Sequence, residues 1–205
     1  MITVLVDKGH GDPPLTGGKE SPDGRLKEYV WALEMAKMVV DSLKAKGVPA
    51  ILLVPETKDI PISERVRRVN RFCSQLGSSN VLLVSIHNNA AKSDRKWHDA
   101  RGFSVFVSKN ASSRSKLCAA IFTEEARKAN LLGNRSVPKE GYWTWSWTRY
   151  DIGILKYSKC PAVLTENLFQ DNRQDVDFLL SHTGKKIICN LTVKAIQRYI
   201  NEVLK

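Results

Sequence analysis

Short apolar runs alternate along this chain with longer segments of helical period, and this alternation constrains the fold more than any other feature. Each run contains β-branched residues and is bounded by polar residues, glycine or proline, as expected of a strand. Helical segments between strands imply βαβ crossovers, and hence a mainly parallel sheet that is covered on both faces. The predicted strands are residues 2–6, 50–54, 81–86, 103–107 and 162–165.

Other segments of the chain carry apolar residues at steps of three and four, which is the period of an amphipathic helix. They are residues 29–43, 62–76, 113–129 and one closing helix after Gly184. A chain of 205 residues, of which 42% are hydrophobic, can bury a core in one domain, which excludes disorder and collagen-like repeats. We therefore expect a single three-layer α/β domain over residues 1–205, with a twisted, mostly parallel sheet flanked by helices.

The chain is strongly basic, with 32 lysine and arginine residues against 21 aspartate and glutamate residues and a net charge of +11. Such a charge favours an anionic partner: nucleic acid, a lipid surface, or a bacterial wall with carboxylates and phosphate polymers. The arginines of residues 62–76 spread over much of the predicted helix, so a focused nucleic-acid stripe is not evident. We expect no nucleic-acid partner.

The cysteines and the N-terminus indicate the compartment in which the chain is made. No apolar run approaches the roughly 18–20 residues of a membrane helix, and no signal peptide is visible. We expect synthesis in the cytoplasm, action beyond it and no stable membrane insertion. Four cysteines lie far apart, which argues against a thiolate zinc finger or a disulfide framework: Cys73, Cys118, Cys160 and Cys189.

Polar side chains follow three of the predicted strands, at the edge where open α/β sheets bind ligands. His10 lies in the loop after the first strand, His87 directly follows the third, and Glu166 directly follows the last. Glu28 opens the helix after the first strand and shares a helix face with apolar residues, so its carboxylate should face the strand ends. A buried carboxylate needs a partner, and a metal ion would be one.

Two histidines and one glutamate form a known catalytic zinc arrangement that leaves a position open for water. We predict that His10, Glu28 and His87 hold one Zn²⁺ per chain and that Glu166 acts as general base and then acid. Each residue alone has a simpler interpretation: a loop histidine, a first-turn carboxylate that the helix dipole favours, or a partner for a basic side chain. Four such residues at one sheet edge are hard to explain in that way.

These residues lie in four sequence blocks, which are VDKGHG at 6–11, DGRLKE at 23–28, SIHNNA at 85–90 and PAVLTENLFQDN at 161–172. Together and in this order, the blocks resemble the zinc-dependent N-acetylmuramoyl-L-alanine amidases of the amidase-3 type, including phage endolysin catalytic domains. Lys8 stands where that family usually has proline, and Asn88 stands where a small residue is common.

The resemblance implies a peptidoglycan hydrolase that cleaves the amide bond between N-acetylmuramic acid and the L-alanine of the stem peptide. It implies a sheet of about six strands, one more than the runs above predict. It also implies zinc ligation by His10, Glu28 and His87, and catalysis by Glu166. We expect such an enzyme to act at the bacterial cell wall with no separate wall-binding domain, and the oligomeric state stays open.

Residues 142–150 hold three of the five tryptophans in a predicted loop, namely Trp143, Trp145 and Trp147. In an extended segment these alternate residues would share one face and could stack on sugar rings or stem peptides. The alternative is an extra strand whose tryptophans pack on the core. We also assign Asn88 and Asn89, beside the second histidine, to substrate binding.

Two other functions remain open from the sequence. A zinc exopeptidase acting on free peptides could use a similar sheet, but many such sites hold two metals, and the sequence offers no further ligand cluster. A basic binding module without catalysis would leave Glu28, His87 and Glu166 unexplained.

Overall fold

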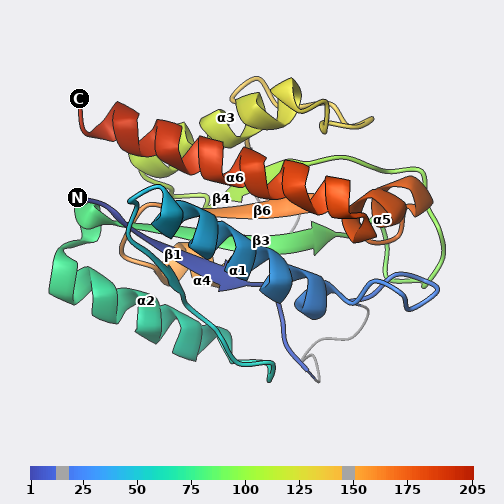
Figure 1. Ribbon diagram of the computed structural model, residues 1–205, viewed down its shortest axis with the longest axis horizontal. Coiled ribbons are helices and arrows are strands. Elements are labelled where there is room, and N and C mark those ends of the chain that lie inside the picture. The colour runs from blue at the N-terminus through green and yellow to red at the C-terminus, as the bar shows by residue number, and fades with distance from the viewer. Residues whose placement is uncertain (13–18, 145–150) are drawn as a thin grey trace.

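In the computed structural model, which describes residues 1–12, 19–144 and 151–205, a six-stranded sheet forms the centre of the molecule (Figure 1). The strand order is β2-β1-β3-β6-β4-β5. Neighbouring strands are parallel except β4 and β6, which are antiparallel. The strands are β1 (Thr3–Lys8), β2 (Ala50–Leu52), β3 (Val81–Asn89), β4 (Ser104–Val107), β5 (Trp143–Thr144) and β6 (Ala162–Phe169).

Helices cover both faces of this sheet (Figure 1), so the predicted three-layer α/β fold is confirmed. One apolar core joins the sheet to α1, α3 and α6, and a second joins its other face to α2 and α4. A short 3-10 helix (Ser78–Asn80) leads into β3. The helices are α1 (Glu28–Ala45), α2 (Ile62–Leu76), α3 (Ser113–Lys128), α4 (Gly153–Tyr157), α5 (Arg173–Leu180) and α6 (His182–Val203).

Strand β1 shows why the predicted strands are apolar throughout. Val4 and Val6 belong to the core under α1 and α6, while Leu5 between them belongs to the core under α2. Successive side chains of a strand point to opposite faces, so a strand with helices on both sides is buried on both. All five predicted apolar runs form strands for this reason.

The sheet has the six strands that the resemblance implies, one more than the apolar runs predict, and two of its strands end later than predicted. β5 has only two residues, so no apolar run predicted it, and the sequence offered it only as the alternative for the tryptophan-rich segment. β3 extends to Asn89 and β6 to Phe169, beyond the predicted ends at residues 86 and 165. The apolar runs stop where polar residues of the candidate site begin, although the backbone pairing continues.

The chain after residue 172 forms two helices, whereas the sequence predicted one closing helix. Asn172 caps α5 by accepting the N–H of Asp175, at 3.1 Å. Ser181 ends that helix and caps α6 by accepting the N–H of Gly184, at 2.9 Å. The last helix therefore begins at His182, before Gly184. No helix among the described residues is both long and apolar enough to cross a bilayer.

Candidate metal centre

The predicted site residues meet at the carboxyl ends of β1, β3 and β6. His87 on β3 lies level with Glu166 on β6, because these strands are parallel neighbours in that register. His10 follows β1, which pairs with the other side of β3. Sheet topology thus brings together residues that are far apart in the sequence.

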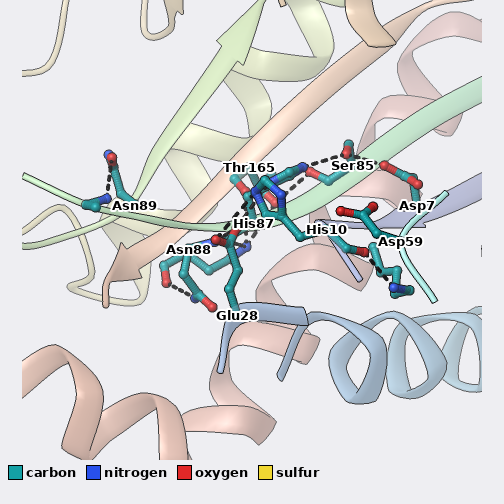
Figure 2. Close-up of polar contacts among 12 residues, drawn as sticks. Asp7, His10, Glu28, Asp59, Ser85, His87, Asn88, Asn89 and Thr165 are labelled. Carbon is teal, nitrogen blue, oxygen red and sulfur yellow. Dashed lines mark hydrogen bonds and ion pairs between the residues drawn. The ribbon is translucent and has the colours of Figure 1, made fainter. Parts of the chain in front are cut away.

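The side chain of Glu28 extends from the start of α1 towards the two histidines (Figure 2). Its backbone N–H opens α1 by donating to the carbonyl of Lys19, at 2.9 Å. The side chain is 1% exposed. Its Oε1 lies 3.1 Å from Nδ1 of His87 and accepts the backbone N–H of Asn88, also at 3.1 Å. Its Oε2 lies 3.6 Å from Nε2 of His10 and has no hydrogen-bond partner among the described residues.

The three side chains converge closely enough to share one ion. One ligand atom from each of His10, Glu28 and His87 can be chosen so that all lie within 4.8 Å of one another. The two imidazole rings are 5.2 Å apart at an interplanar angle of 87°. A buried carboxylate oxygen without a hydrogen bond is costly unless a cation completes its environment. The two nitrogens and one oxygen are a donor set that zinc accepts.

Charge and burial set the protonation of these residues. Burial lowers the pKa of His10 to about 4, which keeps its imidazole neutral and able to bind a metal. Burial also acts to lower the pKa of His87, but the adjacent Glu28 carboxylate outweighs it, so that pKa is raised. For Glu28, burial acts to raise the pKa, and His87 together with His10 outweighs it, leaving the pKa lowered.

Glu166 has the environment expected of a general base. Its Oε2 is buried and has no hydrogen-bond partner in the part of the chain that the structure describes. Burial, with the nearby charge of Glu28, raises its pKa to about 7 although His87 opposes the shift. A carboxyl group with a pKa near neutrality can accept a proton and return it at similar cost.

The two asparagines after His87 hydrogen-bond to neighbouring parts of the protein. Asn88 donates from Nδ2 to the carbonyl of Asn167, at 2.8 Å. Asn89 accepts the N–H of Ala90 at 2.9 Å and donates to Ser104 Oγ at 3.4 Å. These contacts brace the ends of β3, β4 and β6. The substrate-binding role assigned to both asparagines stays a prediction.

Trp143 is the one tryptophan of residues 142–150 that the structure describes. It lies in β5, with its ring 6.2 Å from that of Phe106 and the Arg135 guanidinium 5.6 Å from its centre. At this position the segment forms the extra strand that the sequence left as an alternative. Trp145 and Trp147 lie outside the described residues, so the aromatic platform stays a prediction.

Arg65 is a site residue that sequence reasoning missed. The sequence places it among the arginines that spread over α2, but it is only 2% exposed. Its guanidinium donates to Asp7 and Asp59, each at 2.9 Å, and to the carbonyl of His10 at 3.0 Å. Arg65 lies four residues before Val69, a buried member of the apolar stripe of α2, so helical spacing could have identified it.

Lys8 also supports the histidine loop. Its ammonium donates to the carbonyl of His10 at 2.6 Å, and the side chain is fully buried. His10 has a positive φ of 53°, a conformation that non-glycine residues rarely adopt. Lys8 thus helps hold this turn in its uncommon conformation.

Gly9 leaves space for the second histidine ring. A Cβ atom at this position would lie 2.6 Å from Nδ1 and 2.8 Å from Cε1 of His87. We expect Gly9→Ala to displace this ring and weaken zinc binding about 10- to 100-fold, as for other disturbances of ligand orientation. Competition with a chromophoric chelator measures the affinity. Gly153→Ala on α4 is the control, and unchanged affinity in Gly9→Ala would contradict the geometry.

Together, these features define an α/β protein with a candidate metal centre at the carboxyl edge of its sheet. The family described as Amidase_3, N-acetylmuramoyl-L-alanine amidase, matches residues 4–198. The chain belongs to this N-acetylmuramoyl-L-alanine amidase family.

Individual relatives agree with the family match. An endolysin of Bacillus phage SPP1 is 26% identical over 180 residues, which cover 86% of this chain and 58% of the endolysin. The amidase LytC of Bacillus subtilis is 26% identical over 178 residues, which cover 86% of this chain and 31% of LytC. The chain thus spans little more than half of the first relative and about a third of the second.

Solved structures agree on the fold. An N-acetylmuramoyl-L-alanine amidase from Clostridium difficile 630 superposes with a TM-score of 0.80 at 21% identity, covering 98% of this chain and 97% of that one. The amidase Ami1 from Mycobacterium smegmatis gives a TM-score of 0.80 at 18% identity with the same coverage.

Proposed function

We propose that this chain is a zinc-dependent amidase that hydrolyses the bond between N-acetylmuramic acid and the L-alanine of the stem peptide. The observation that carries the proposal is the pair of buried carboxylates at one sheet edge. Within residues 1–12, 19–144 and 151–205, Glu28 has one carboxylate oxygen without a hydrogen-bond partner beside the two histidines, and Glu166 on β6, next to β3, has another. Family membership favours this reaction over the zinc exopeptidase alternative.

His10, Glu28 and His87 would hold the zinc, and Glu166 would move the proton. Zinc, when bound, polarises the scissile carbonyl and lowers the pKa of a water molecule. Glu166 accepts the proton of the attacking water, because the raised pKa of its carboxyl group suits it to do so near neutral pH. The same carboxyl group then donates that proton to the amine of L-alanine as the bond breaks.

The surface charge supports a substrate at the bacterial wall. The chain carries a net charge of +11, and peptidoglycan with its attached polymers is anionic. Electrostatic attraction raises the encounter rate with such a surface and weakens as salt is added. We propose that the enzyme acts on peptidoglycan at the cell wall.

Digestion of purified peptidoglycan with and without a chelator tests the proposal. We expect stem peptides with free L-alanine amino ends in the mass spectrum, abolished by chelation and restored by zinc. Intact wall despite a confirmed bound zinc would favour the exopeptidase. Absence of bound metal together with undiminished hydrolysis in chelator would contradict the zinc assignment.

A further inference from the structure

A chain of buried polar side chains lies behind His87. Nε2 of His87 is 3.2 Å from Oγ of Ser85, and the Ser85 hydroxyl donates to Oδ2 of Asp7 at 2.6 Å. The other carboxylate oxygen of Asp7 accepts from Arg65 at 2.9 Å. Figure 2 shows Asp7, Ser85 and His87 in this succession. Asp7, Ser85 and Arg65 have no part in the mechanism above.

The direction of each hydrogen bond follows from the chemistry of the groups. The Asp7 carboxylate, paired with an arginine, can only accept. The single hydroxyl proton of Ser85 is therefore donated to Asp7, and only lone pairs of its oxygen remain for His87. Nε2 of His87 must then carry a proton and donate it. In a neutral imidazole this leaves Nδ1, 3.1 Å from Glu28, with the free lone pair.

Arg65 anchors this series of hydrogen bonds and also the loop that carries His10. A guanidinium has five N–H donors in a fixed planar arrangement, and here the acceptors match them in number. The ion pair with Asp7 joins two side chains that are almost completely buried. The acceptors of Arg65 are Asp7, Asp59 and the backbone carbonyls of Lys8, His10 and Ile60.

We propose that Arg65, Asp7 and Ser85 are positioning residues that fix His87 in the tautomer protonated at Nε2, so that Nδ1 faces the metal. The proposal rests on the proposed metal centre. A hydrogen bond to the second ring nitrogen fixes the orientation of a ligating histidine, and its loss typically weakens metal binding about 10- to 100-fold.

The wild-type protein provides a direct test. Long-range ¹H–¹⁵N NMR spectra of the zinc-loaded chain report which ring nitrogen of each histidine carries a proton. Comparison with His98→Gln and His182→Gln, which lie outside the centre, assists the assignment. We expect a protonated Nε2 and a metal-bound Nδ1 for His87. A proton on Nδ1 of His87 would overturn the proposal.

Asp7→Asn tests the direction of the hydrogen bonds. Its amide oxygen can still accept from Arg65, so the NH₂ group would face Ser85. The serine hydroxyl would then donate to Nε2 of His87, which selects the opposite tautomer. We expect zinc affinity about 10- to 100-fold lower than in the wild type. Ser85→Ala removes the acceptor and should weaken binding within the same range.

Ser108→Ala is the matched control. Ser108 is also buried and its hydroxyl also donates to a carboxylate, that of Asp151. It follows β4, which runs antiparallel to β6, so it lies at the opposite edge of the sheet. We expect its zinc affinity to equal that of the wild type.

The outcomes separate the positioning proposal from the metal centre. Wild-type affinity in Asp7→Asn and Ser85→Ala would overturn the proposal while leaving the zinc site intact, and so would an equal loss in Ser108→Ala. If the wild type bound no zinc, the metal centre itself would be wrong and the positioning role with it. Where a variant fails to fold, as judged by circular dichroism, the wild-type NMR spectrum decides.

Discussion

Glu166→Gln is expected to lower the rate of peptidoglycan hydrolysis about 10²- to 10⁴-fold and to leave one zinc bound per chain. Glutamine has nearly the same shape, but it can neither accept the proton of water nor return one to the leaving amine. Glu166 is not among the three residues that converge on the candidate metal position, so zinc should stay. Release of L-alanine amino ends gives the rate, and atomic absorption gives the metal content.

Glu125→Gln is the control for this substitution. Glu125 lies on α3 and is largely buried, and it forms ion pairs with Lys128 and Arg198. A loss of activity in Glu166→Gln alone would therefore report on the site and not on buried carboxylates in general. Activity within a few-fold of wild type in Glu166→Gln, with zinc present, would remove Glu166 from the role of general base.

The position of the candidate site could be predicted because it depends on topology. Parallel strands end at a common edge, so residues that follow different strands meet there whatever their separation in the sequence. To predict the positions of His87 and Glu166, it was enough to identify β3 and β6 as strands. Glu28 needed one further step, because a carboxylate at the start of an apolar helix stripe must face the same edge.

The residues that support the site were harder to predict, because their partners lie on other elements, far away in the sequence. Arg65 lies on α2, and the sequence around it does not indicate that its ion-pair partner is Asp7. Two polar residues inside apolar strands, Asp7 in β1 and Ser85 in β3, were an available signal, since buried polar groups need partners. Strand β5 left a weak signal, because its two residues cannot define a period and only the alternating tryptophans indicated an extra strand as an alternative.

Glu28→Gln is expected to abolish the stabilisation that zinc gives to the folded chain. A ligand present at about 1,000 times its dissociation constant stabilises the native state by about 4 kcal/mol. For a domain of this size, that corresponds to a rise in melting temperature of about 8–16 °C. Glutamine keeps the shape of Glu28 but removes the charge, and its NH₂ group would place donors where the ion should be. Thermal unfolding with zinc and with chelator measures the difference.

Glu34→Gln provides the comparison on the same helix. Glu34 is exposed and forms an ion pair with Lys185, away from the histidines. The zinc-dependent rise in melting temperature of Glu34→Gln should equal that of the wild type. Glu28→Gln should melt at the same temperature with and without zinc. An undiminished rise in Glu28→Gln would show that zinc binds without this carboxylate. The Glu28 oxygen that has no partner among the residues the structure describes would then need another explanation, because burial without a partner is costly for a charged group.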